Sequence, residues 1–250
     1  MSDLITVQGV VLSAMPVGEY DRRIELLTRE RGRISAFAKG ARRQNSPFMA
    51  VTTPFVFGTF TLFEGKTSYN LSQVAVQHQF TELSQIQPGI YYGYYFLELA
   101  QYFGREGTDE KEMMNLLYVT VKALLKKDMD PRLVRCIFEL RTMTEQGMMP
   151  VLTECGGCGE SVPEDGCFIS QEAHGVLCDA CSRMAKDAWR ISAAALYTMR
   201  YIVSVPMGKL YTFRVTDEVL SELERFIHLY VSKNTDRRFK TLDILQVMCS

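Results

Sequence analysis

The chain has 250 residues, enough for one large domain or two to three small ones, and 47 % of them are hydrophobic, as in proteins that bury a core. The formal net charge of −1 argues against a protein that binds polyanions over its whole surface. No run of about 18 apolar residues is present, and residues 1–6 have no basic or long apolar region. We therefore expect a cytoplasmic protein without signal peptide or membrane span, whose cysteines stay reduced.

Residues 1–80 predict a small β-barrel. Segments rich in β-branched and aromatic residues, several of them alternating with polar ones, occur at 5–12, 24–28, 33–39, 55–63 and 69–76. Five short strands punctuated by glycine within about 80 residues favour a small barrel. A tight hairpin is expected at 29–32, and an exposed, basic loop at 39–47.

Positive charge is concentrated in this first segment. Residues 22–43 carry eight basic and two acidic side chains, a net charge of +6. A groove for single-stranded nucleic acid combines cations for phosphates with aromatic faces for bases. The candidate phosphate contacts are Arg22, Arg23, Arg33, Lys39, Arg42 and Arg43, and the candidate stacking residues are Phe37, Phe48 and Tyr69. A solvated strand face without a ligand is an equally good interpretation of the pattern, because small barrels also bind proteins and sugars.

From about residue 88 the hydrophobic period becomes helical. Tyr92, Phe96, Leu99 and Phe103 share one helix face, and the aromatic residues at 91–96 are expected in a core or domain interface. Further helices are predicted at 109–127, 131–147, 193–203, 217–233 and 242–248. The helix that begins at Pro131 carries three arginines beside apolar residues, Arg132, Arg135 and Arg141. They could form a groove for an acidic peptide tail, or a solvated face on a packed helix.

Two Cys-x-x-Cys pairs lie between these helices: Cys155 and Cys158, then Cys178 and Cys181. This spacing allows four thiolates to surround one zinc ion, and a four-sulfur site is structural because no position stays open for water. A redox switch on the zinc is the alternative. Cys167 and His174 are possible substitute ligands, and Cys136 and Cys249 are expected to be buried small hydrophobes.

The chain has none of the common catalytic motifs. We find no Gly-x-x-x-x-Gly-Lys, no His-Glu-x-x-His and no Gly-x-Ser-x-Gly, and the three histidines are scattered. We therefore expect a protein that is not an enzyme.

Several segments together resemble the RecO family of bacterial recombination mediators. Near the N-terminus these are Gly-Val-Val-Leu at 9–12, Tyr-Asp-Arg-Arg-Ile at 20–24, Leu-Leu-Thr at 26–28, Gly-Arg-Ile at 32–34 and Ala-Lys-Gly-Ala-Arg-Arg at 38–43. Later in the chain they are Phe-Glu-Leu-Arg at 138–141, Gly147, Pro150 and Cys-Gly-Gly-Cys-Gly at 155–159.

The resemblance implies an α+β multidomain protein. An OB-fold barrel at 1–80 would be followed by an α-helical domain at 81–150 and 186–250, interrupted by a four-cysteine zinc module at 151–185. The implied function is DNA repair and recombination by the RecFOR pathway, in a bacterial, nucleoid-associated protein. Such proteins bind single- and double-stranded DNA, anneal complementary strands, contact RecR and the acidic C-terminal tail of single-stranded DNA-binding protein, and help to load RecA. The six cations named above become DNA contacts, and the four paired cysteines become zinc ligands.

A second hypothesis is a zinc-stapled protein-interaction scaffold whose contact with DNA is weak or indirect. The two hypotheses differ on whether the segment with net charge +6 faces nucleic acid. Many members of the family are more basic than this chain, whose overall charge is −1. This low charge argues against tight binding to DNA without a partner.

Overall fold

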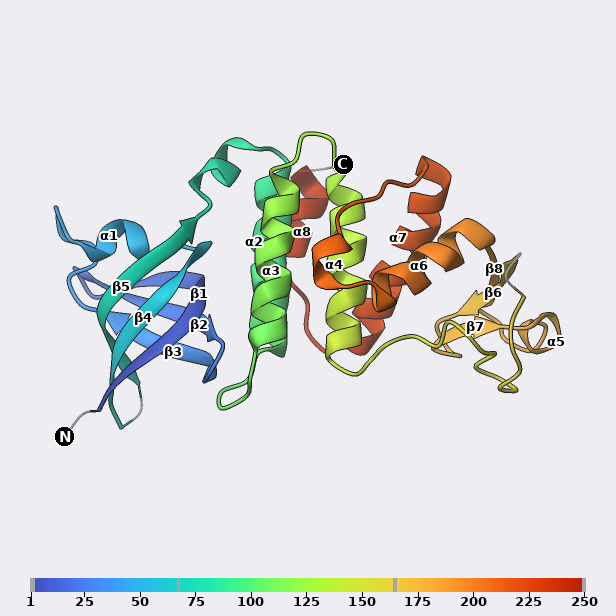
Figure 1. The fold of residues 1–250 in the computed structure, drawn as a ribbon, viewed down its shortest axis with the longest axis horizontal. Coiled ribbons are helices and arrows are strands. Elements are labelled where there is room, and N and C mark those ends of the chain that lie inside the picture. The colour runs from blue at the N-terminus through green and yellow to red at the C-terminus, as the bar shows by residue number, and fades with distance from the viewer. Residues whose placement is uncertain (1–2, 67, 164–165, 249–250) are drawn as a thin grey trace. The chain divides into compact units, whose positions relative to one another are not determined.

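The structure is a computed structural model that describes residues 3–66, 68–163 and 166–248. It divides into two compact units (Figure 1). The first contains the chain up to Leu125 together with the segment from Phe239 onward, and the second spans Lys126–Arg238. In the described part of the chain, no helix is long and apolar enough to cross a membrane.

The first unit contains a closed five-stranded barrel, with strand order β1-β2-β3-β5-β4. All neighbours pair antiparallel except β3 and β5, which pair parallel at two positions. Five strands closed in this way form an OB-type barrel, which confirms the predicted fold class. The strands are β1 (Leu4–Val17), β2 (Asp21–Thr28), β3 (Gly32–Ala38), β4 (Val56–Glu64) and β5 (Tyr69–Gln79), with the short helix α1 (Phe48–Val51) between β3 and β4.

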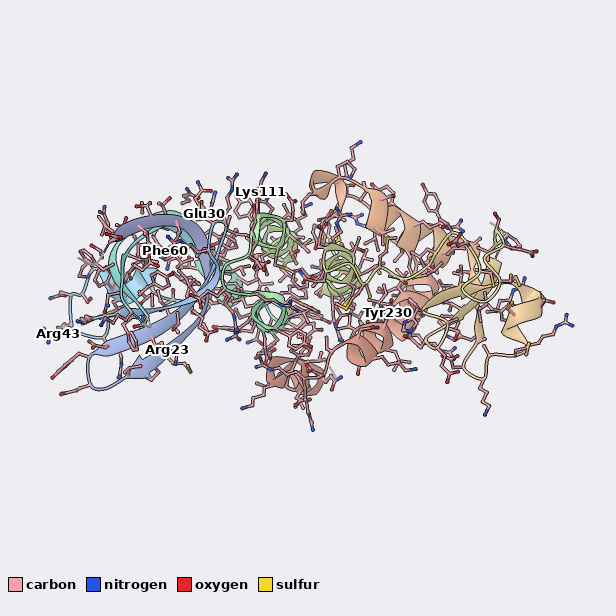
Figure 2. The ribbon with its side chains drawn as sticks, turned by 90° about the horizontal axis from the view of Figure 1, so that it is seen from below. Arg23, Glu30, Arg43, Phe60, Lys111 and Tyr230 are labelled. Atoms are coloured by element: carbon pink, nitrogen blue, oxygen red, sulfur yellow. The ribbon has the colours of Figure 1, made fainter. Side chains whose placement is uncertain are left out.

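Alternate residues of the strands fill the barrel. Ile24, Ala36 and Phe60 are fully buried in one apolar core, and Figure 2 shows Phe60 inside the ring of strands. Close approach of the strands requires glycine at Gly9 and Gly58, which pair with each other across β1 and β4. A Cβ atom would lie 2.8 Å from a backbone oxygen at Gly9 and 2.5 Å at Gly58, so larger residues would push the strands apart.

Three longer helices complete this unit: α2 (Gly89–Phe103), α3 (Lys111–Leu124) and α8 (Lys240–Met248), with the 3₁₀ turn η1 (Thr81–Gln85) before them. The predicted face of α2, with Tyr92 and Phe96, is buried. Glu98 of α2 accepts hydrogen bonds from the backbone N–H groups of Lys240 (3.4 Å) and Thr241 (2.9 Å). These bonds satisfy donors at the start of α8 and fix it against α2.

The second unit is a set of packed helices with a small sheet. The helices are α4 (Pro131–Glu145), α6 (Ala193–Ser204) and α7 (Asp217–Asn234), with the 3₁₀ turn η2 (Met207–Lys209). Each long helix begins at an oxygen cap, because Asp130, Ser192 and Thr216 accept from backbone N–H groups of the first turn. The sheet has the order β7-β6-β8 and is formed by β6 (Gly166–Ser170), β7 (Gly175–Leu177) and β8 (Trp189–Ser192), with the short helix α5 (Asp179–Ser182) beside it.

Side chains fasten the sheet to the helices of this unit. Gln171 Nε2 donates to the backbone oxygen of Phe226 in α7 at 2.8 Å, and Arg200 Nε of α6 donates to the backbone oxygen of Leu152 at 2.8 Å. Asp187 accepts from Ser170 Oγ at 2.5 Å and from two backbone N–H groups. The segment with the four cysteines is therefore anchored at several points by bonds that do not involve sulfur.

Candidate nucleic-acid interface and metal centre

One outer face of the barrel combines a cation with an aromatic ring. Met15, Arg23 and Phe37 lie in register across β1, β2 and β3. Their neighbours Ile24 and Ala36 point into the core, so these three side chains point outward. Arg23 is exposed, and its Nε donates to Ser35 Oγ of β3 at 2.7 Å, which holds the guanidinium along the strand face.

The loop after β3 brings further cations to the same end of the strands. Lys39, Arg42 and Arg43 are all exposed. Arg42 Nη1 donates to the backbone oxygen of Gly18 at 3.2 Å, and the Arg43 guanidinium lies 5.1 Å from the ring centroid of Tyr20. Figure 2 shows Arg43 and Arg23 outside the ring of strands. None of these cations has a carboxylate partner among the residues that the structure describes, so their charge is available to a ligand.

The other two predicted cations have internal contacts. Arg22 Nη1 donates to the backbone oxygen of Met49 (2.7 Å) and to Thr52 Oγ1 (2.9 Å), so it holds α1 against the barrel. Arg33 Nη1 lies 3.8 Å from a carboxylate oxygen of Glu25. Arg33 is four positions before Phe37 on β3, a separation of roughly 13 Å along the strand. The six cations therefore do not form one continuous cluster.

The structure corrects one of the three predicted stacking residues, Tyr69. Tyr69 is 8 % exposed and belongs to the barrel core, and Phe48 is partly buried against the same core. A strand pattern shows which residues alternate, but the closure of the barrel decides which of the two faces is inside. Phe37 is half-buried on the outer face beside Arg23, so it remains a candidate for stacking on a base.

The three arginines of α4 differ in accessibility. Arg135 is paired with the fully buried Glu139 at 2.8 Å, and Arg141 Nη1 donates to the backbone oxygen of Val203 at 2.7 Å. Arg132, whose side chain is 42 % exposed, bonds to both Asp130 and Asp217. Periodicity placed all three on one helix, but in the structure Arg135 is buried and Arg141 is partly buried.

Sequence patterns did not reveal a groove beside α6. It has a volume of about 610 Å³, and its walls come from Tyr197 and Tyr201 on α6 and from Phe213 and Val215 before α7. Tyr197 is 69 % exposed. The aromatic residues at 197, 201 and 213 were visible in the sequence, but only the packing of the loop before α7 against α6 brings them together.

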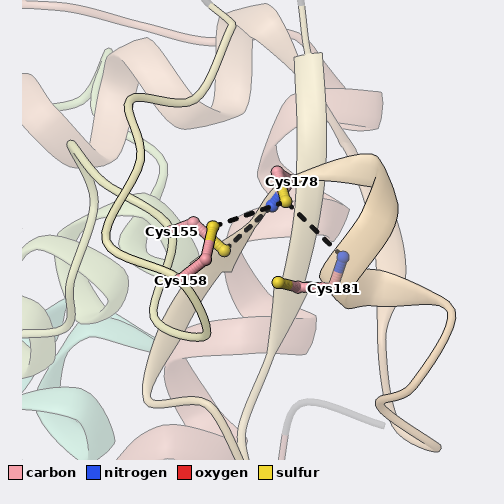
Figure 3. Close-up of side chains that lie close together, drawn as sticks. All are labelled: Cys155, Cys158, Cys178 and Cys181. Carbon is pink, nitrogen blue, oxygen red and sulfur yellow. Dashed lines mark hydrogen bonds between the residues drawn. The ribbon is translucent and has the colours of Figure 1, made fainter.

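The four paired cysteines converge on one point (Figure 3). Their sulfur atoms all lie within 4.8 Å of one another, and Cys158 Sγ is 3.8 Å from Cys178 Sγ. Sulfurs bound tetrahedrally to zinc at about 2.3 Å would be roughly 3.8 Å apart, so the cluster has the size of a tetrathiolate zinc site. Cys155 and Cys158 lie on the loop before β6, Cys178 is the N-cap of α5, and Cys181 lies within that helix.

The surroundings of Cys155 favour a thiolate. Its sulfur accepts from the backbone N–H groups of Gly157 (3.4 Å) and Cys178 (3.3 Å). Burial raises the pKa of Cys155, but backbone N–H groups outweigh this and lower the pKa to about 6. A Cβ atom at Gly157 would lie 3.0 Å from Cys181 Sγ, so this turn leaves space for the cluster because it is glycine. The donors and the space both fit a metal bound by four thiolates.

The other cysteines that the structure describes do not join the cluster. Cys167 is buried in β6, and His174 contacts the ring of Tyr230, so neither is among the grouped ligand atoms. Cys136 is fully buried, as predicted. Cys249 lies outside the described residues.

The chain combines an OB-type barrel that carries exposed cations, a set of packed helices and a four-cysteine insert, and this architecture defines a modular α+β protein. The model described as "Recombination protein O N terminal" matches residues 1–80, and "Recombination protein O C terminal" matches residues 89–243. The chain belongs to this family. Relatives named DNA repair protein RecO include that of Symbiobacterium thermophilum, 30 % identical with 99 % of this chain and 98 % of the relative covered. That of Acetivibrio thermocellus is 28 % identical, with 98 % and 97 % covered.

Proposed function

We propose that this chain acts in DNA repair and recombination as a mediator that binds DNA and catalyses no bond change. The observation that carries the proposal is the set of exposed cations that have no carboxylate partner among the described residues, beside Phe37 on the outer face of the barrel. Cations of this kind bind phosphates, and an aromatic face between them can stack on a base. The names of the relatives support the same role.

In this proposal the six predicted cations have different tasks. Arg23, Lys39, Arg42 and Arg43 contact phosphates of single- or double-stranded DNA directly. Arg22 acts by holding α1 in position, and Arg33 extends the path along β3. Because phosphate contacts carry no sequence information, binding would be independent of sequence, as annealing of any complementary strands requires.

The helical part of the second unit would provide the protein contacts. Arg132 bonds to Asp217. Thr216 and Val219, which lie within two residues of Asp217 in the sequence, line the aromatic groove beside α6. A cation beside an apolar groove suits the acidic C-terminal tail of single-stranded DNA-binding protein, if Arg132 exchanges an internal carboxylate for one of the tail. Arg135 and Arg141 would support α4 from within. RecR and, indirectly, RecA are the other partners that we propose, with the nucleoid as the place of action.

We also propose one structural zinc ion, bound by Cys155, Cys158, Cys178 and Cys181. Zinc supplies a cross-link between the loop before β6 and α5, which have little core of their own. All four positions around the metal would be filled by sulfur, so the site would have no place for a water nucleophile.

Fluorescence anisotropy of labelled single-stranded DNA over a salt series tests the proposal. Each phosphate contact contributes about −0.7 to the log–log salt slope, so four direct contacts predict a slope of roughly −2.8. Absence of binding even at low salt would favour the alternative, a protein-interaction scaffold that reaches DNA through its partners.

A further inference from the structure

The four cysteines differ strongly in their exposure to solvent. Cys155 is 2 % exposed, Cys178 and Cys181 are intermediate, and Cys158 is exposed. A symmetric, closed metal site would shield its ligands about equally. Here one ligand is open to small molecules in solution, while its partner in the same Cys-x-x-Cys pair is buried.

Backbone hydrogen bonds also hold the sulfur of the buried Cys155. The sulfur of Cys155 is held by backbone N–H groups of Gly157 and Cys178. Donors of this kind draw electron density from a thiolate and restrict its movement, so they reduce attack by that sulfur. Burial and hydrogen bonding therefore both protect Cys155 from oxidants.

A reaction partner for Cys158 lies close by. Its Sγ is 3.8 Å from Cys178 Sγ, and Figure 3 draws this contact from one pair to the other. Closing it to the disulfide length of about 2.05 Å requires a movement of roughly 1.8 Å. Cys158 and Gly159 lie on an exposed turn, and Gly159 has a φ of +76°. Apart from its chain neighbours, no described atom lies within 4 Å of a Cβ added at Gly159, so this turn is not packed against another described segment.

We propose that Cys158 is a peroxide-sensitive modification site, and that its oxidation forms a Cys158–Cys178 disulfide which releases the metal. The proposal rests on the zinc assigned above. In the first step, the Cys158 thiolate attacks hydrogen peroxide, forms a sulfenic acid and expels hydroxide. In the second, Cys178 thiolate attacks that sulfur, the disulfide forms and a second hydroxide leaves. The two thiolates lose two electrons, which reduce one peroxide.

Loss of these ligands leaves Cys155 and Cys181, fewer than zinc sites in proteins use, so the ion dissociates. The disulfide then joins the two halves of the insert in place of the metal. A thiol reductant together with zinc reverses the change, because a disulfide, unlike sulfinic acid, is readily reduced. The exposed, metal-stapled insert would thereby report peroxide, a DNA-damaging oxidant.

The test treats the full, zinc-loaded chain with hydrogen peroxide and follows zinc release with a chelating dye. Peptide mapping identifies the disulfide at partial oxidation. We expect zinc release to parallel formation of the Cys158–Cys178 disulfide. Met184, which is 89 % exposed, reports the oxidant dose through its sulfoxide. Retention of zinc and free thiols while Met184 is oxidised would overturn the proposal, as would a dominant Cys155–Cys158 disulfide.

Variants separate the roles of the two ligands. Imidazole can replace one thiolate in zinc sites, so Cys158→His should keep zinc and Cys155→His is its matched control. If all four thiolates reacted equally, either change would slow release by about a quarter. We expect Cys158→His to slow it much more than Cys155→His, and equal effects would refute the assignment. Cys167→Ser should change nothing.

Zinc content before peroxide tests the metal assignment separately. A chain without zinc would refute the metal assignment and, with it, the release of metal. Mapping of the disulfide would then test separately whether Cys158 and Cys178 are the sulfurs that peroxide joins. If neither histidine variant binds zinc, the order in which the wild-type chain loses its thiols tests the assignment. We expect Cys158 and Cys178 to be lost first, and earlier loss of Cys155 would refute it.

Discussion

Replacing Arg42 and Arg43 by alanine tests the DNA interface most directly. Both side chains are exposed, and they contact the Gly18 carbonyl and the Tyr20 ring; within the described part of the chain neither is paired with a carboxylate. Removing two phosphate contacts should make the log–log salt slope less steep by about 1.4. If affinity at 1 M salt is unchanged, binding at 0.1 M salt weakens roughly 25-fold, or about 1.9 kcal/mol.

The matched control is Arg29→Ala with Arg31→Ala. It lowers the net charge by the same two units within the same basic segment, but Arg31 is paired with Glu64 at 3.1 Å at the other end of β3. Anisotropy with several DNA sequences should show a uniform loss for the first pair and a small loss for the control. Equal losses would mean that only overall charge matters, and a loss confined to one sequence would indicate base readout. Thermal melts should be similar, because the backbone bonds of Arg42 and Arg43 in the loop remain.

Three further predictions concern the second unit. Cys178→Ser should lose zinc and make the insert sensitive to protease while the helices stay folded. Unchanged zinc content would contradict the metal site, and Cys167→Ser is the control. Glu139→Ala leaves the Arg135 charge buried and should lower the free energy of unfolding by about 3–5 kcal/mol in denaturant titrations, whereas a loss below about 1 kcal/mol would argue against a buried pair. Burial raises the pKa of Asp187, but hydrogen bonds from a hydroxyl and from backbone N–H groups outweigh this and lower the pKa overall. The contribution of Asp187 to stability is therefore present above about pH 4 and is lost as the pH falls through the lowered pKa. Asp187→Asn should make the melting temperature fall less steeply at acid pH, and an unchanged acid dependence would refute this.

The internal electrostatics of α4 were invisible in the sequence. The pattern there shows arginines beside apolar residues, which is compatible with a binding groove or a packed helix. The structure buries Glu139 completely between α4 and α7, beside Arg135 and within 3.5 Å of His228 Nε2. Burial lowers the pKa of His228, although the Glu139 carboxylate opposes this. Such groups meet only through contacts between helices 80 to 90 residues apart in the chain, and no local pattern encodes those contacts.

The cysteine spacing and the strand alternation were sufficient by themselves for the two main modules. Two Cys-x-x-Cys pairs allow few geometries, because each short turn already brings two sulfurs together. Alternation with glycine turns likewise identified the strands of the barrel, since the pleat puts every second side chain on one face. Both inferences depend on neighbours within a few residues, where sequence and geometry are tightly linked.

Tertiary structure alone decided which side of each pattern faces outward. Barrel closure turned Tyr69 into the core and left Phe37 outside, although both lie in alternating segments. Packing of the loop before α7 against α6 created the aromatic groove at Tyr197. The folding of the insert exposed Cys158 and buried Cys155, two residues with the same local motif. Exposure is a property of how distant segments pack, and therefore the reactive and binding surfaces could not be derived from the order of residues.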